Sequence, residues 1–104
     1  MVKNKTVVRD FFLGFIKIHI LHHASKGPVY GLWLIEELGR HGYSLSPGTL
    51  YPILHKLEKD KLLKSHSVLV SGKIRKYYKA ASKGTNTLSE MKEKMQELMR
   101  EIMK

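Results

Sequence analysis

The stretch Leu45-Ser-Pro-Gly-Thr-Leu-Tyr-Pro-Ile-Leu-His-Lys-Leu-Glu58 decides the fold of this chain. Ser46 and Pro47 suit the first positions of a helix, because neither needs the amide hydrogen bonds that are missing there. Apolar side chains then recur at helical spacing and are expected to face a core: Leu50, Ile53, Leu54 and Leu57. The side chains expected on the outer side can touch base edges and phosphates: Thr49, Tyr51, His55, Lys56 and Lys59.

Two predicted helices precede this stretch. The apolar side chains of residues 9–24 leave little polar surface, so this helix is expected to be buried on more than one side: Phe11, Phe12, Phe15, Ile16, Ile18 and Leu21. Tyr30–Arg40 forms the second predicted helix, and residues 42–44 form a tight turn that leads to Ser46. Two helices joined by a short turn that contains glycine predict a helix-turn-helix.

The periodicity changes after the third helix. Ser65–Val70 and Lys73–Ala80 are predicted strands, and Ser71-Gly72 is a plausible hairpin turn between them. One face of the second strand is expected to pack, through Ile74, Tyr78 and Ala80. The opposite face is basic and aromatic, through Lys73, Arg75, Tyr77 and Lys79. The predicted fold class is α+β and mostly α, a winged helix-turn-helix with three helices and a two-stranded wing.

The last predicted helix covers residues 87–103, after a predicted turn at residues 82–86. Its apolar residues step by three and four alternately, the spacing of a heptad seam, and Met103 widens the seam. We expect this helix and the first one to supply a dimer contact: Phe12, Phe15, Leu88, Met91, Met95, Leu98, Met99 and Ile102. Packing of the last helix on the first helix of its own chain stays open. The expected division is a winged-helix domain at 1–81 and a dimerisation helix at 82–104, packed on the same domain.

Composition favours a polyanionic partner. The 104 residues carry a net charge of +10, of which +9 falls in residues 1–81. This excess can attract nucleic acid, although ordinary lysine-rich solubility remains an alternative. The absence of cysteine excludes disulfides and fits a reducing cytoplasm. No run approaches the ~18 apolar residues of a membrane span, so a cytoplasmic protein is expected.

Several of these segments together resemble the PadR family of transcriptional regulators. The matching segments are Gly27-Pro-Val-Tyr-Gly31, Ile35-Glu-Glu-Leu38, Leu45-Ser-Pro-Gly-Thr-Leu-Tyr-Pro52, Leu57-Glu58, Leu62-Leu63, Arg75-Lys-Tyr-Tyr78 and Ser82-Lys-Gly84. The resemblance implies a winged-helix repressor that acts as a homodimer on double-stranded DNA with near-palindromic operators. It also implies release by a small aromatic or cationic effector held near the dimer interface.

Two departures from the family pattern bear on the C-terminal part of the chain. The region after the wing has only one short helix, so the chain resembles the compact branch of the family. The segment Ala80-Ala81-Ser82-Lys83 lacks the Leu-Thr and the acidic residue usual at that join. The geometry between the second strand and the last helix is therefore open.

The candidate DNA-binding residues lie on the third helix and on the wing. They are Ser46, Gly48, Thr49, Tyr51, His55 and Lys56, followed by Lys73, Arg75 and Lys76 around the expected wing tip. Free amides at the start of the helix favour a phosphate, and Pro52 is expected to bend the helix. A purely structural role for Tyr51, beside the core, is an equal alternative.

Other functional classes receive less support. His19, His22 and His23 have at least two members on one helix face, but no cysteine or carboxylate is evident nearby, so neither a metal nor a cofactor is expected. Trp33 is expected in the core or an interface. Any effector pocket would be lined by the first and last helices: Phe12, Phe15, Met91, Met95 and Met99.

Catalysis is disfavoured, because the sequence offers no nucleophile motif, phosphate loop or paired carboxylates. The alternatives to a sequence-specific regulator are an architectural or RNA-binding winged-helix protein and a basic protein-interaction module.

Overall fold

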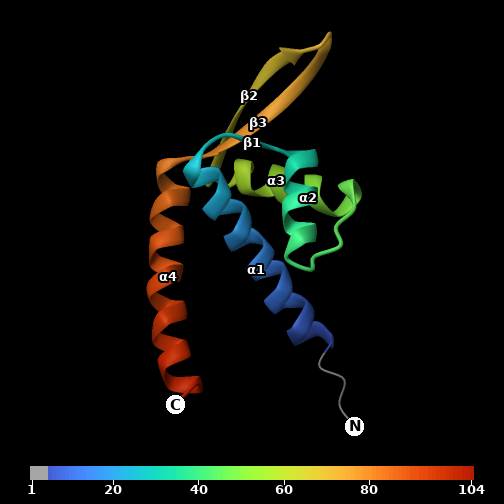
Figure 1. The fold of residues 1–104 in the computed structure, drawn as a ribbon. Coiled ribbons are helices and arrows are strands. Elements are labelled where there is room, and N and C mark those ends of the chain that lie inside the picture. The colour runs from blue at the N-terminus through green and yellow to red at the C-terminus, as the bar shows by residue number, and fades with distance from the viewer. Residues whose placement is uncertain (1–4) are drawn as a thin grey trace.

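A computed structural model describes residues 5–104 and contains four helices and three strands (Figure 1). Their bounds are α1 Lys5–Lys26, β1 Val29–Tyr30, α2 Gly31–Arg40, α3 Pro47–Lys59, β2 Leu63–Val70, β3 Lys73–Ala80 and α4 Ser82–Ile102. The predicted α+β, mostly α, winged helix-turn-helix is confirmed. The N-terminal residues 1–4 lie outside the described part.

The first strand was not predicted. Val29 pairs with Tyr78 and Tyr30 with Tyr77, both antiparallel, so the sheet has three strands in the order β1-β3-β2. Tyr30 was expected to begin the second helix, but its backbone is extended and α2 begins at Gly31. The pairing anchors the connection between α1 and α2 on the wing strand that enters the core.

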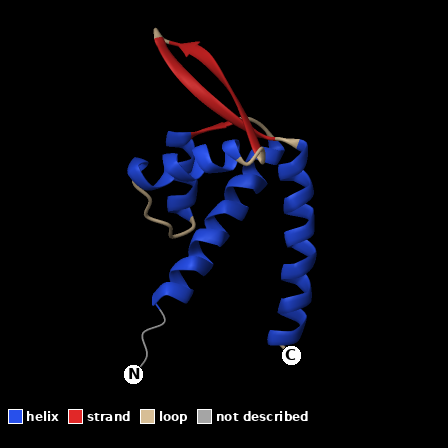
Figure 2. Cartoon of the chain, turned by 180° about the vertical axis from the view of Figure 1, so that it is seen from behind, coloured by secondary structure: helices blue, strands red, loops and turns tan. Residues whose placement is uncertain are grey.

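The hairpin between β2 and β3 is confirmed. Val70 pairs with Lys73, which leaves Ser71 and Gly72 as a two-residue loop. Both loop residues have positive φ, 50° and 79°, as a type I′ turn requires. Figure 2 shows the hairpin projecting beyond the helices. The prediction that Ile74 packs is therefore wrong, because this residue lies near the tip and is 76% exposed.

One core joins the helices to the base of the sheet. Its buried members come from α1, β1, α2, α3, β2 and β3: Ile16, Ile20, Leu21, Ala24, Val29, Leu34, Leu38, Leu50, Leu54, Leu57, Leu63 and Tyr78. Trp33 is partly buried and packs against this core, which is one of the two placements expected for it, the other being an interface. Tyr78 of β3 is the largest of the fully buried side chains, and it packs the base of the wing into this core.

Helix α4 begins earlier than predicted. Residues 82–86 were expected to form a turn, but they are the first residues of α4, and the Thr85 amide donates to the Ala81 carbonyl at 3.0 Å. Gly84 is buried here, and a side chain at this position would overlap the Leu62 carbonyl. Glycine disfavours a helix in isolation. Here α4 includes Gly84, because only a glycine allows the helix to pack this closely against Leu62.

The molecule is extended for its length. Its radius of gyration is 15.2 Å, against about 13 Å for a compact chain of this size. Helices α1 and α4 diverge away from the sheet in both views (Figures 1 and 2). The expected burial of the first helix on several sides is wrong within one chain, because Phe11 is 61% and Phe12 45% exposed. No helix among residues 5–104 is long and apolar enough to cross a membrane.

A polar contact joins α1 to the C-terminal end of α2. The Glu37 carboxylate lies 3.5 Å from His23 and 3.2 Å from His41, and it accepts a hydrogen bond from Arg40 at 2.7 Å. The expectation that no carboxylate lies near the histidines of the first helix is therefore wrong. Burial, together with the neighbouring histidines, lowers the pKa of His19 and of His23.

Replacing Gly84 by alanine tests the α4 attachment. The added methyl group would overlap the Leu62 carbonyl and touch Leu21, so Gly84→Ala should lower the free energy of unfolding by about 1–3 kcal/mol. Gly14→Ala is the matched control, because open space surrounds this α1 position and alanine favours helix. Urea denaturation measures both. Wild-type stability for Gly84→Ala would contradict this packing.

Candidate nucleic-acid interface

The start of α3 presents a polar, exposed turn. Ser46 has an extended backbone with φ −88° and ψ 161°, and its carbonyl accepts the amides of Thr49 and Leu50, each at 3.0 Å. Ser46 is the N-cap residue of α3, as its position before Pro47 predicts, but its hydroxyl makes no hydrogen bond to a backbone amide and lies 3.3 Å from the Thr49 hydroxyl. The two exposed hydroxyls therefore accompany a positive helix end that suits a phosphate.

The apolar side of α3 is buried and its polar side is exposed, as the residue types of the two sides predict. Leu50, Leu54 and Leu57 are buried in the core, and Ile53 is partly buried against it. The candidate DNA-binding residues of this helix are all exposed: Ser46, Gly48, Thr49, Tyr51, His55 and Lys56. The core thus fixes the rotation of the helix, and the rotation fixes which polar groups face outward.

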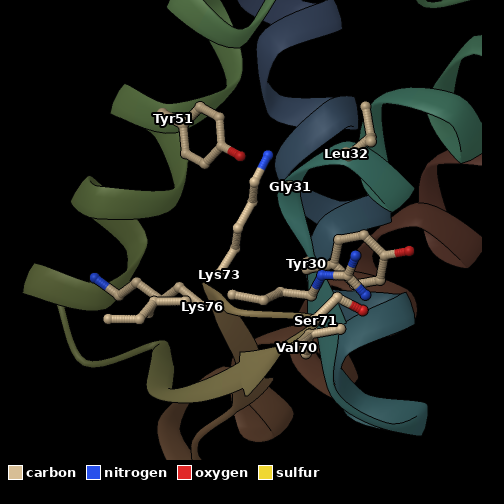
Figure 3. A pocket seen from close by; sticks show the side chains of 10 residues that line it. Tyr30, Gly31, Leu32, Tyr51, Val70, Ser71, Lys73 and Lys76 are labelled. Atoms are coloured by element: carbon tan, nitrogen blue, oxygen red, sulfur yellow. The ribbon is translucent and has the colours of Figure 1, made fainter.

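A groove of about 470 Å³ lies between α3, the start of α2 and the wing. It brings Tyr51 together with Lys73, Arg75 and Lys76 of β3. In Figure 3 the Tyr51 hydroxyl and the Lys73 ammonium point toward one another across the groove. Positive groups and a hydroxyl around one concave strip match a nucleic-acid backbone.

Arg75 is held in place by aromatic neighbours. Its guanidinium lies 4.0 Å from the centre of the Tyr30 ring and donates a hydrogen bond to the Tyr77 hydroxyl at 3.4 Å. The hydrogen bond to Tyr77 raises the pKa of Arg75 further above neutrality, so the group is always charged. Stacking of this kind orients the cation before any ligand arrives.

The lysines of the site differ in their surroundings. The Lys76 ammonium lies 3.5 Å from Glu58 of α3, and the Lys56 ammonium lies 3.3 Å from Asp60. The expected gathering at the wing tip is wrong for Lys76, which leans back onto α3. Because exposed ion pairs contribute little in water, both lysines can exchange these carboxylates for phosphates at small cost.

The remaining candidates lie outside the groove. Ser46, Gly48 and Thr49 lie at the start of α3, just before Tyr51, and the ring centre of His55 lies 6.3 Å from that of Tyr51. Sequence reasoning missed Tyr30 of β1 and Gly31 and Leu32 of α2, which also line the groove. The signal for this contact is the glycine at the start of α2, because a glycine lets another side chain approach the backbone closely. A side chain at position 31 would overlap the Tyr51 ring.

A second hollow separates α1 from α4, with a volume of about 360 Å³. It is lined by Phe15, Ile18, His19, His22, Leu88, Lys92 and Met95. Of the expected effector-pocket residues, Phe15 and Met95 therefore line it, whereas Phe12, Met91 and Met99 do not. The hollow opens between the two helices that were expected to supply the dimer contact.

Comparison with known proteins agrees with this geometry. Residues 20–90 match the family described as transcriptional regulator PadR-like. The transcriptional regulator Rv3488 of Mycobacterium tuberculosis is 47% identical over 96 residues, which cover 92% of this chain and 90% of the relative. These matches are to regulators of transcription rather than to enzymes.

Solved structures show the same fold. A PadR-like transcription factor from Bacteroides fragilis is 31% identical with a TM-score of 0.83, over 94% of this chain and 96% of the other. A PadR-like transcriptional regulator from Bacillus cereus is 32% identical with a TM-score of 0.80, over 89% and 92%. The chain belongs to the PadR-like family of transcriptional regulators.

Proposed function

We propose that this protein is a homodimeric repressor that binds a near-palindromic operator through α3 and the wing. The observation that carries the proposal is the groove in which Tyr51 of α3 meets Lys73 and Arg75 of the wing. A helix in the major groove and a hairpin beside it would place this concave strip along the intervening sugar-phosphate backbone. Repression is the sign of regulation that the family resemblance favours.

The residues of the site divide between phosphate and base contacts. Ser46 and Gly48, at the positive end of α3, are placed to hold a phosphate, as are the cations of the wing. Thr49 and His55 are exposed on α3 and are the groups we assign to base edges, while the Tyr51 hydroxyl in the groove is placed to reach a phosphate. The phosphate contacts would fix position and affinity, while the base contacts would select sequence.

The wing assignment is tested by the salt dependence of binding. Each lost phosphate contact should reduce the slope of log affinity against log salt by about 0.9. Lys73→Ala and Arg75→Ala should each lower this slope and weaken binding to every DNA sequence alike. Fluorescence anisotropy over a salt series measures both effects.

Lys104→Ala is the matched control for the wing variants, since it removes one charge at the end of the chain farthest from the wing (Figure 1). Its slope should equal that of the wild type. If Lys73→Ala and Arg75→Ala keep the wild-type slope as well, the wing does not touch phosphate.

A second copy of this chain is the partner we propose for the diverging helices. The accessible surface is 7,668 Å², whereas a compact monomer of this mass exposes about 6,000 Å². Apolar side chains account for much of the exposed ends of α1 and α4: Phe11, Phe12, Leu98, Met99, Ile102 and Met103. Pairing of α4 with α4 of a second copy, against α1, would bury this surface and place two α3 helices on one face.

The same contacts support the proposed division of the chain into two parts. Within α4, Gly84 is buried and Leu88 packs on the core, while the later apolar residues are partly or largely exposed. Residues 1–81 would therefore form the DNA-binding domain, and residues 82–104 a dimerisation helix attached to it by its first turns. The hollow between α1 and α4 would become the place for a small aromatic or cationic effector.

Leu98→Glu tests the dimer. This side chain is 53% exposed in one chain, so a charge there leaves the monomer fold intact but opposes burial against a partner. Multi-angle light scattering should give monomers for Leu98→Glu. Gln96→Glu adds the same charge at another exposed position of α4 and should remain dimeric. A dimer that survives in Leu98→Glu contradicts the proposed interface.

A further inference from the structure

Two pairs of potential metal ligands face one another across the contact between α1 and α2. His19 and His23 are four residues apart on α1, whereas Glu37 lies in α2 and His41 directly follows the end of that helix. Side chains spaced by four lie on one face of a helix, so His19 and His23 extend from the same side of α1. Glu37 and His41 are brought together by their direct contact at 3.2 Å. The same spacing of two histidines is used by helical zinc sites.

The distances between the ligand atoms suit a small cation. His23 Nε2 and His41 Nε2 lie 3.5 and 3.2 Å from the same carboxylate atom, Glu37 Oε2, and the three residues offer ligand atoms within 4.8 Å of one another. Zinc bonds of about 2.0–2.2 Å in a tetrahedron place neighbouring ligand atoms about 3.3–3.6 Å apart. The cluster therefore needs only small side-chain rotations to close around an ion.

The second carboxylate oxygen is already engaged. Arg40 donates a hydrogen bond to Glu37 Oε1 at 2.7 Å, which leaves Oε2 directed at the two histidines. Metal-binding carboxylates and imidazoles are commonly oriented by outer hydrogen bonds of this kind. Arg40 is thus a positioning residue for the carboxylate rather than a ligand.

An independent observation concerns His19. Its Nδ1 atom is buried and has no hydrogen-bond partner among residues 5–104. A buried polar atom without a partner is costly, and such atoms are uncommon in folded proteins. The His19 ring lies with its centre 5.1 Å from the ring of His41 and 6.2 Å from that of His23. His19 therefore borders the cluster and offers an unpaired imidazole nitrogen for a fourth ligand position.

We infer that His23, Glu37 and His41 form a binding site for a divalent transition-metal ion such as Zn²⁺, with His19 or a water molecule in the fourth position. Imidazole and carboxylate ligands suit Zn²⁺, Co²⁺ and Ni²⁺, whereas Mg²⁺ and Ca²⁺ prefer oxygen ligands alone. An ion at this place would tie α1, which carries the exposed apolar side chains, to α2 of the helix-turn-helix. The site does not depend on the proposed DNA-binding function.

Calorimetric titration of the tag-free full chain with zinc chloride tests the site. One ion should bind per chain, and magnesium chloride should give no comparable binding. Loss of an outer hydrogen-bond partner alone weakens metal sites roughly 10- to 100-fold, so Glu37→Gln and His41→Gln should each weaken zinc binding at least about tenfold. His41 is 48% exposed, so its replacement leaves the core intact.

His55→Gln and His66→Gln are the matched controls, because both remove an exposed histidine outside the cluster. Zinc affinity in these two variants should equal that of the wild type. If the wild type binds no zinc, or if Glu37→Gln and His41→Gln bind it as tightly as the controls do, the site does not exist.

Trp33 supplies a second readout at the site itself. It is the single tryptophan, and its ring centre lies 5.3 Å from that of His23. Co²⁺ bound to His23 should quench its fluorescence saturably, and Zn²⁺ should reverse the quenching by competition. In His41→Gln the same Co²⁺ concentrations should quench far less. Equal saturable quenching in both proteins would place the ion elsewhere and overturn the assignment.

Discussion

The burial of one side of α3 is the constraint on which the proposed DNA-binding surface depends. Leu50 and Leu54 are fully buried and Leu57 nearly so, and each such side chain contributes about 1.5–3 kcal/mol relative to its exposed state. The net stability of a small domain is only about 5–15 kcal/mol, so these three contacts are a large share of it. Any rotation of α3 that turned other side chains outward would expose these three leucines to water. Recognition and stability are therefore consequences of the same packing.

The position of the wing depends on the same core. Tyr78 is buried to 1% exposure, and its strand pairs with β2 on one side and with β1 on the other. The tip of the hairpin projects beyond the helices, whereas its base packs against them through Leu63 and Tyr78. Arg75 stacks on Tyr30 of β1, and Lys76 lies beside Glu58 of α3, so both side chains connect the wing to the helix-turn-helix. The groove thus has walls from three elements whose relative placement is set by one set of buried side chains.

Local sequence patterns predicted the elements well where periodicity was strong. The amphipathic pattern of α3, the Ser71-Gly72 turn and the helix-turn-helix order are all present as expected. The patterns failed where a contact distant in sequence decides the structure. Gly84 belongs to a helix because it packs against Leu62, and β1 is two residues long and exists only through its pairing with β3. Ile74 alternates in sequence with the basic residues of β3, as a packed residue would, but it lies next to the hairpin turn, where no core residue can cover it.

The same distinction applies to the sites. The sequence indicated which side of α3 faces outward, because a helical period settles it. It could not indicate that Lys76 leans toward Glu58, or that Gly31 makes room for Tyr51. The histidines of α1 looked isolated in the sequence because their carboxylate, Glu37, arrives from α2 only when the helices pack. Clusters formed by two elements require the tertiary fold, whereas faces of one element do not.

Sequence-specific DNA binding is the central claim, and fluorescence anisotropy on two DNAs tests it most directly. The protein is titrated into the DNA upstream of its own gene and into a scrambled duplex of the same composition, over a series of salt concentrations. We expect a preference of about a thousandfold or more for the upstream DNA, and we expect it to persist at physiological salt. Equal affinity for both duplexes, lost together as salt rises, would show phosphate attraction alone and contradict it.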